Sequence, residues 1–361
     1  MVVKVGTSTL TGPDGRVDRD YLDGLAAQVA SLAADGTEVV LVTSGAIAAG
    51  VESLGLAERP SDISGLQATA SVGQVAIIRT YSDIMAARGM TVGQVLLTRH
   101  DTAHRRQYLL ACRTLERLLA MGIVPVVNEN DTTAVEEIKF GDNDTLAALV
   151  GIMVRADLVI LLSDIEGVFD AHPSTETARL VSRVDELTDE LAAAAGGPGT
   201  EHGSGGMATK IEAARVLMKA GIPMVVCDGR RPGVVLDAAQ GKPVGTYFAA
   251  PDAAGAGRKL WVAYGRAPAG RVVVDAGARS ALIERGASLL PAGVVDVGSA
   301  FSAGDVVDLV GPDGVVFARG EAGMSAEDLD GIKGSTSVDI ATLAPALAGV
   351  EVIHRDRLVI L

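Results

Sequence analysis

Two patterns of hydrophobic residues alternate over the first 250 residues of the chain: apolar residues at helical spacing and short aliphatic runs. From Asp18, apolar residues recur every three or four positions, which is typical of an amphipathic helix with Asp18 as its N-cap and Gly36 at its end. Short aliphatic runs, typical of strands buried on both faces, alternate with such helical stretches at residues 39–42, 92–97, 123–127, 158–162 and 224–227. This alternation predicts an α/β fold with a mostly parallel sheet that is covered by helices on both faces.

The pattern changes after residue 250. Residues 251–260 are mostly small, include Gly and Pro and show no period, so we interpret them as a linker. Short runs that indicate strands follow at residues 260–264, 271–274, 306–310, 315–318 and 358–360. The turn at residues 311–314 predicts a hairpin. The sequence therefore predicts a large domain over residues 1–250 and a small β-rich barrel or sandwich over residues 261–361.

Composition narrows the class of protein. Hydrophobic residues make up 48% of the chain but aromatic residues only 3%, so we expect an aliphatic core of the kind that strands covered by helices form. The formal net charge of −14 disfavours binding to nucleic acid through a general positive field. An anionic ligand would therefore need a dedicated pocket.

The same sequence bears on the cellular compartment. The apolar stretch at residues 146–162 is interrupted by Arg155 and Asp157, so we expect no membrane-spanning helix. The N-terminal residues show no pattern of a secretion signal, and two cysteines cannot form a disulfide framework in a chain of 361 residues. We expect a cytoplasmic protein.

Glycine-containing segments after two predicted strands are candidates for phosphate or ligand binding. Lys4 follows an apolar start and precedes Gly6, which puts a cation beside backbone N–H groups. A solvated lysine next to an ordinary turn fits this segment about as well. Ser44 and Gly45 follow the run at residues 39–42, where open α/β sheets bind ligands, although a plain strand-to-helix turn has the same pattern.

A third glycine-containing segment, residues 203–210, opens a helix and ends in Lys210. It would bring backbone donors, a helix N-terminus and a cation to one phosphate chain, whereas the alternative is a mobile surface loop. The segment lacks the P-loop pattern. No strand precedes it, which argues against a nicotinamide dinucleotide site.

Polar and acidic residues gather at two strand ends and one helix start. Residues 128–131 follow one predicted strand, Ser163 and Asp164 follow another, and residues 141–144 open a helix. Such groups can hold an ammonium group, orient lysines or bind a divalent cation, and helix N-capping is the alternative for residues 142–144. His100 and His104 lack carboxylate or cysteine partners nearby, so we interpret them as an exposed helix start rather than a zinc site.

Five of these segments, in this order along the chain, resemble motifs of the glutamate 5-kinase family within the amino acid kinase superfamily: residues 3–8, 42–47, 128–131, 141–144 and 205–210. The resemblance covers both domains, and residues 271–339 are similar to the PUA domain of many bacterial members. It implies the amino acid kinase fold. It also implies ATP-dependent phosphorylation of the γ-carboxylate of L-glutamate to γ-glutamyl phosphate, the first step of proline biosynthesis.

The resemblance further implies roles for individual residues. Lys4 and Lys210 would act on the ATP phosphates and the transferring phosphoryl group, and Asp144 would orient both lysines. The residues that hold glutamate would be Ser44, Gly45, Asp131, Asp142 and Asn143. The residues that bind ATP would be Lys4, Gly6, Ser163, Asp164, Ser204, Gly205, Gly206, Met207, Ala208, Thr209 and Lys210.

The family also suggests cofactors and partners. Magnesium would come with the ATP phosphates rather than bind at a metal site of the protein. Proline would act as a feedback inhibitor, and the chain would form a homo-oligomer, either a dimer or a tetramer.

Two other readings remain open. An acetylglutamate, aspartate or uridylate kinase would share the lysines and glycines, although the polar clusters at residues 128–131 and 142–144 favour an unblocked amino acid. The second alternative is an RNA-binding protein with a PUA domain. From Gly257 onward the chain has 10 basic and 13 acidic residues, a net charge of −3, whereas binding to a phosphate backbone predicts a positive charge.

Overall fold

The computed structural model describes residues 1–133, 143–171, 175, 177–188, 191, 206–250 and 268–360. The chain divides into two compact units, residues 1–254 and 255–361, and each is described by itself. The predicted linker and the predicted strand at residues 260–264 lie outside the described residues. No helix among the described residues is long and apolar enough to span a membrane.

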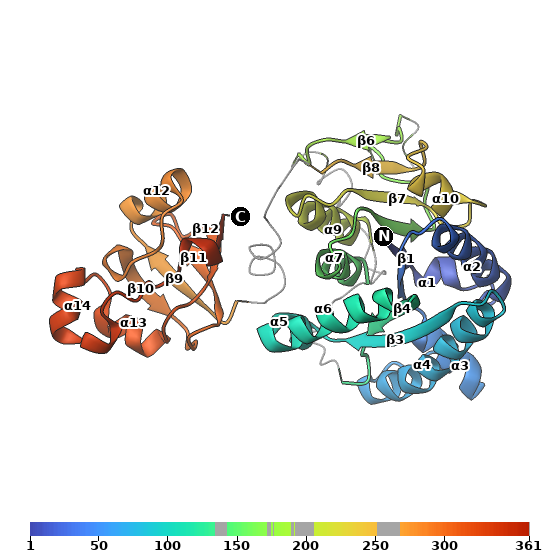
Figure 1. The fold of residues 1–361 in the computed structure, drawn as a ribbon, viewed down its shortest axis with the longest axis horizontal. Helices are drawn as coiled ribbons and strands as arrows, with labels where there is room; N and C mark the ends of the chain where they lie inside the picture. Colours follow the sequence, from blue (N-terminus) through green and yellow to red (C-terminus); the bar gives the residue numbers. More distant parts are fainter. Residues whose placement is uncertain are drawn as a thin grey trace. The chain divides into compact units, whose positions relative to one another are not determined.

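The first unit is built on an eight-stranded sheet with the strand order β3-β4-β2-β1-β5-β7-β8-β6 (Figure 1). Its strands are β1 (Val2–Val5), β2 (Val40–Thr43), β3 (Thr91–Leu97), β4 (Ile123–Glu129), β5 (Val159–Ser163), β6 (Arg183–Val184), β7 (Met224–Asp228) and β8 (Thr246–Phe248). From β3 to β7 all neighbouring strands are parallel, and β8 is antiparallel to β7. The predicted α/β fold with a mostly parallel sheet is confirmed, and each of the five predicted aliphatic runs overlaps a strand.

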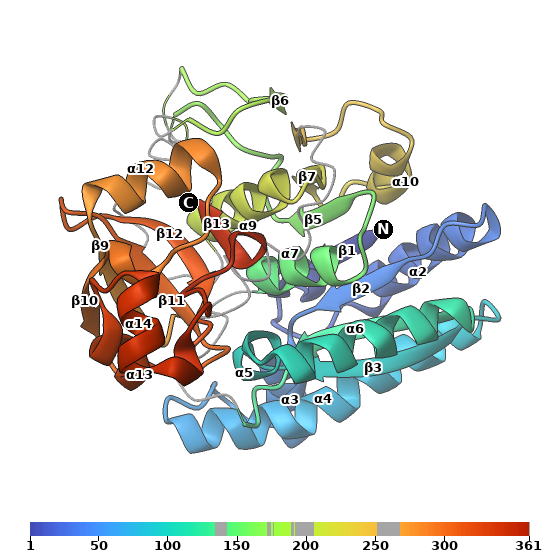
Figure 2. The same ribbon diagram turned by 60° about the vertical axis from the view of Figure 1, so that its left-hand side comes forward.

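Helices cover both faces of this sheet. They are α1 (Thr7–Leu10), α2 (Arg19–Ala34), α3 (Ala46–Leu54), α4 (Ile63–Ala86), α5 (Arg99–Ala103), α6 (Arg105–Ala120), α7 (Asn143–Met153), α9 (Met207–Lys219) and α10 (Val234–Ala239). One face packs against apolar side chains of α2, α4 and α10, which form a single core cluster with every second residue of the strands. On the other face α7 and α9 lie side by side (Figures 1 and 2).

Side chains alternate between the two faces of the sheet along β1, and this alternation determines on which face Lys4 lies. Val3 and Val5 belong to the core cluster under α2, α4 and α10. The side chain of Lys4, between them, therefore projects to the opposite face, where α7 packs against β1. The strand is central in the sheet, and Lys4 pairs in register with Val42 of β2 and Leu161 of β5.

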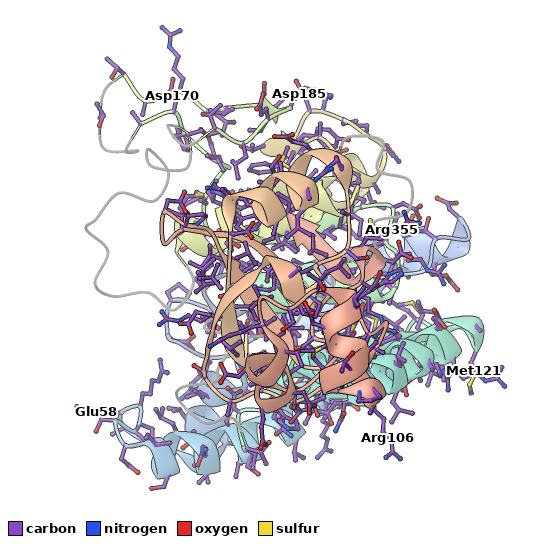
Figure 3. All side chains as sticks on the ribbon, turned by 90° about the vertical axis from the view of Figure 1, so that its left-hand side faces the viewer. Glu58, Arg106, Met121, Asp170, Asp185 and Arg355 are labelled. Atoms are coloured by element: carbon purple, nitrogen blue, oxygen red, sulfur yellow. The ribbon has the colours of Figure 1, made fainter. Side chains whose placement is uncertain are left out.

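Local signals in the sequence explain how several helices begin. The side chain of Asp18 accepts a hydrogen bond from the backbone N–H of Tyr21, so the predicted N-cap of α2 is confirmed. Helix α6 is amphipathic: Leu115 is buried, whereas Arg106 near its start and the C-cap residue Met121 are exposed and project outward (Figure 3). His100 and His104 lie at the ends of the short helix α5 with stacked rings, and the described residues contain no cluster of three potential metal ligands.

The second unit is a five-stranded mixed sheet with the strand order β10-β9-β11-β12-β13. Its elements are β9 (Gly270–Val274), α12 (Ala276–Arg285), η2 (Pro291–Gly293), β10 (Val294–Gly298), β11 (Val306–Val310), β12 (Val316–Glu321), α13 (Ala326–Ile332), α14 (Ser337–Leu343), η3 (Pro345–Leu347), η4 (Arg355–Arg357) and β13 (Leu358–Ile360). The predicted hairpin joins β11 to the antiparallel β12, with a hydrogen bond from Gly311 N to Val315 O of 2.9 Å. The β-rich character is confirmed, and the sequence analysis missed β10.

Glycine allows α3 and α4 to approach each other closely. A Cβ atom at Gly73 would overlap the backbone carbonyl oxygen of Ala46, and one at Gly50 would overlap that of Thr69. Neither carbonyl can rotate away, because each belongs to the backbone of a helix. The contact also fixes the start of α3, which follows Ser44 and Gly45.

We expect Gly73→Ala to lower the free energy of unfolding by about 3 kcal/mol or more, because the added methyl group forces the two helix backbones apart. The matched control is Gly24→Ala in the middle of α2, where an added Cβ meets no atom within 4 Å. This change should raise stability by about 0.5–1 kcal/mol. Urea denaturation followed by circular dichroism measures both, and equal effects would contradict the proposed packing.

Candidate active site

A buried carboxylate joins two lysines that are far apart in the sequence. Asp144 Oδ1 lies 2.6 Å from Lys4 Nζ, and Asp144 Oδ2 lies 3.0 Å from Lys210 Nζ. Asp144 is fully buried, and the two lysines are 4% and 5% exposed. Three elements supply these groups: β1, the first turn of α7 and the first turn of α9. The structure thus brings together the two lysines and the aspartate that the sequence analysis singled out.

The starts of two helices stabilise this cluster. Asp144 lies in the first turn of α7, where the helix dipole favours an anion. Thr209, in the first turn of α9, places its hydroxyl oxygen 3.2 Å from Asp144 Oδ2 and 2.7 Å from the carbonyl oxygen of Gly206, two acceptors that share its one proton. Gly206 is the N-cap of α9 and offers no side-chain cap, so the N–H groups of the first turn, which begins with Met207 and Ala208, face the same region as Lys210.

The turn after β1 leaves room above Lys4. A Cβ atom at Gly6 would lie 3.5 Å from Lys4 Nζ, so a larger side chain there would crowd the ammonium group. On the neighbouring strand β5, Ser163 is buried and donates a hydrogen bond of 3.2 Å to Asp164 Oδ1. Strands β1 and β5 are parallel, and Val5 pairs with Leu162. Gly6 and Ser163, the next residue on each chain segment, therefore lie side by side at the carboxyl ends of the two strands.

A second, uncharged cluster lies at the carboxyl ends of β2 and β4. The amide nitrogen Nδ2 of Asn143 is 2.7 Å from Thr43 O, 2.7 Å from Ser44 Oγ and 3.0 Å from Asn128 Oδ1. Gly45 has a positive φ of 86° and a Cβ there would lie 2.5 Å from Leu10 Cδ2, so only glycine fits this turn. Asp131 lies in the turn after β4 and is partly buried.

Thr43 is fixed by a buried hydrogen bond of 2.9 Å between its Oγ1 and the hydroxyl of Tyr81. Burial raises the pKa of Tyr81 to about 12, and the hydrogen bond to Thr43 opposes this shift. The phenol is therefore neutral at physiological pH. The backbone of β2 is held in place just before Ser44.

The structure does not cover every predicted site residue. Asp142, Ser204 and Gly205 lie outside the described residues. Gln74 of α4, which is 5% exposed and accepts a hydrogen bond from Asn128 Nδ2, was not among the predicted site residues. The signal was present in the sequence, because Gln74 occupies the buried stripe of α4 together with Ala70, Ile77 and Tyr81.

Comparisons with known proteins find two matching family models and several similar relatives. Residues 1–228 match the model of the amino acid kinase family, and residues 270–343 match that of the PUA domain. The chain is 46% identical to a glutamate 5-kinase from Geobacter sp. (strain M21) over 100% of this chain and 97% of the relative. Glutamate 5-kinases of Myxococcus xanthus and Geobacter sulfurreducens are 46% and 42% identical, again over 100% of this chain and 96% and 97% of the relatives.

We expect Asp144→Asn to lower the free energy of unfolding by about 3–5 kcal/mol, because two buried ammonium groups lose the anion that they share. Inorganic pyrophosphate should restore part of this loss by supplying negative charge. Asp237→Asn is the matched control, since Asp237 also contacts two cations, Arg231 and Lys242, but on the surface. Thermal unfolding with and without pyrophosphate measures these effects, and equal losses in the two variants would contradict the role of burial.

Proposed function

The chain belongs to the glutamate 5-kinase family of the amino acid kinases, and on that basis we propose that it transfers the γ-phosphoryl group of ATP to the γ-carboxylate of L-glutamate. The product is γ-glutamyl phosphate, the first intermediate of proline biosynthesis. The observation that carries the proposal is the pair of buried ammonium groups on one carboxylate, at the edge of the sheet where parallel strands end.

The charged cluster fits the phosphoryl group. Phosphoryl transfer needs in-line alignment and positive charge near the equatorial oxygens more than it needs covalent help from the protein. Each ammonium group is a cation with N–H donors, and Asp144 holds both nitrogens at a fixed separation. In this proposal Lys4 and Lys210 contact the phosphates. Glutamate needs no general base, because its γ-carboxylate is ionised at neutral pH.

The residues around the lysines divide between the two substrates. On the side of β5 and α9, ATP contacts Gly6, Ser163, Asp164 and the glycine-rich segment that ends at Lys210, including Ser204, Gly205 and Thr209. On the side of β2 and β4, glutamate contacts Ser44, Gly45, Asp131, Asp142 and Asn143. The hydrogen bonds of Asn143 and Thr209 support this division, because they place an amide on one side of Asp144 and the start of α9 on the other.

Magnesium would enter with ATP. Both carboxylate oxygens of Asp144 already face lysine nitrogens, and the described residues contain no group of three carboxylates, histidines or cysteines placed to hold a metal ion. Such surroundings fit an ion carried on the phosphate oxygens, as magnesium commonly is, rather than in a cage of protein ligands. The ion would neutralise part of the phosphate charge.

We further propose that proline inhibits the enzyme and that the chain forms a dimer or a tetramer.

The first test is ATP consumption with glutamate, N-acetylglutamate, aspartate and UMP as acceptors, each with and without 10-fold excess EDTA over magnesium. Of the four acceptors, we expect only glutamate to be phosphorylated. EDTA should abolish this turnover, and added proline should inhibit it. Preferred turnover of another acceptor would contradict the proposed substrate. Analytical ultracentrifugation gives the oligomeric state.

The second test addresses the lysines. We expect Lys4→Ala and Lys210→Ala each to lower kcat by about 100- to 1,000-fold, because each removes a cation aimed at developing charge. Lys242→Ala, on the surface, is the control and should leave kcat unchanged. The same ATP-consumption assay measures all three variants. Near-normal turnover of Lys4→Ala or Lys210→Ala would rule out a catalytic role for the substituted lysine.

A further inference from the structure

Gln74 is a polar side chain in the buried face of α4. It is 5% exposed and lies in the stripe that otherwise packs apolar and small side chains against the sheet. Burying an uncharged amide costs free energy unless its donors and acceptor are hydrogen-bonded. The partners of Gln74 therefore indicate why an amide is present at this position.

A chain of hydrogen bonds runs from Gln74 to the proposed glutamate site. Gln74 Nε2 donates to the carbonyl oxygen of Glu129 at 3.1 Å, and Gln74 Oε1 accepts from Asn128 Nδ2 at 3.3 Å. Asn128 Oδ1 accepts from the backbone N–H of Glu129 at 2.9 Å and from Asn143 Nδ2 at 3.0 Å. Asn128 is 3% exposed, so water cannot easily replace these partners.

Backbone groups fix the direction of every bond in this chain. A carbonyl oxygen can only accept, so Glu129 O requires the NH₂ group of Gln74, which turns Gln74 Oε1 toward Asn128. Asn128 then presents its oxygen to Asn143. At the Asn143 end of the chain of hydrogen bonds, two further acceptors, Thr43 O and Ser44 Oγ, also lie within hydrogen-bonding distance of the NH₂ group of Asn143. The carboxamide of Asn143 thus has one allowed orientation.

This orientation leaves an acceptor turned away from the network. Asn143 Oδ1 is buried and makes no hydrogen bond with any residue in the described part of the chain. A buried acceptor without a partner is costly, and a bound ligand with a donor would remove that cost. Among the groups of glutamate, only the ammonium is a strong donor at neutral pH.

We propose that Gln74 is a positioning residue for substrate recognition: through Asn128 it orients Asn143, so that Asn143 Oδ1 accepts a hydrogen bond from the ammonium group of glutamate. This inference rests on the proposed function. Gln74 contacts no reacting atom. Its effect falls on discrimination between an amino acid and an analogue without the ammonium group, and not on the handling of ATP.

The test uses Gln74→Met, which keeps the length of the side chain but removes both hydrogen bonds. We expect KM for glutamate to rise about tenfold, the equivalent of one well-formed hydrogen bond, with KM for ATP changed by less than about twofold. Glutarate has both carboxylates of glutamate and lacks the ammonium group, so its inhibition constant should stay the same. Calorimetric titration with glutamate gives the same comparison without turnover.

Two further variants make the outcome decisive. Thr80→Val is the matched control on α4, because the hydroxyl of buried Thr80 donates to Ala76 O within the same helix, and the change should alter neither constant. Gln74→Leu also removes both hydrogen bonds without burying a charge, and it serves if Gln74→Met does not fold; we expect the same rise in KM for glutamate and the same unchanged inhibition constant for glutarate.

Equal weakening of glutamate and glutarate, or an unchanged KM for glutamate, would overturn the role of Gln74. Absence of glutamate-dependent ATP consumption in the unmodified protein would instead overturn the proposed function. The two failures are therefore distinguishable.

Discussion

The shared carboxylate of Asp144 is the interaction on which the rest of the site depends. A buried ammonium group is costly, and two of them next to each other would repel, so neither lysine could stay at its position without an anion between them. The fold supplies that anion where a helix dipole stabilises it, in the first turn of α7. In the proposed function, the same two cations meet a second anion when phosphate binds. The protein thus keeps the cations in place and dehydrated before substrate arrives, and little reorganisation is needed during transfer.

The uncharged cluster beside it follows a different physical rule. Its bonds run from amide groups to other amides, to the backbone or to a hydroxyl, and their strength depends on geometry rather than on net charge. Neutral partners of this kind suit a zwitterionic amino acid, since they select the position of a donor without adding charge close to the phosphates. In the proposed function, the two clusters together accommodate an anionic nucleotide and an amino acid within one edge of the sheet.

The sequence predicted those features that depend on local pattern. The aliphatic runs predicted the strands and Asp18 predicted the start of α2, whereas glycine-containing segments pointed to Lys4 and Ser44 and a polar helix start pointed to Asn143. Gln74 and Asn128 were not predicted as a pair because their pairing depends on α4 packing under β4, which no local pattern encodes. The missed strand β10 has the same cause: its exposed and partly buried residues form a strand through pairing with β9.

The start of α7 couples the two clusters. Asn143 and Asp144 are consecutive, and consecutive residues of an α-helix point in directions about 100° apart. Asp144 accordingly faces β1 and α9, whereas Asn143 faces β2 and β4. A shift of this helix end would move the anion between the lysines and the amide that holds the amino acid at the same time. In the proposed function, one rigid backbone turn therefore sets the separation between the lysines that contact the phosphates and the amide that contacts the amino acid.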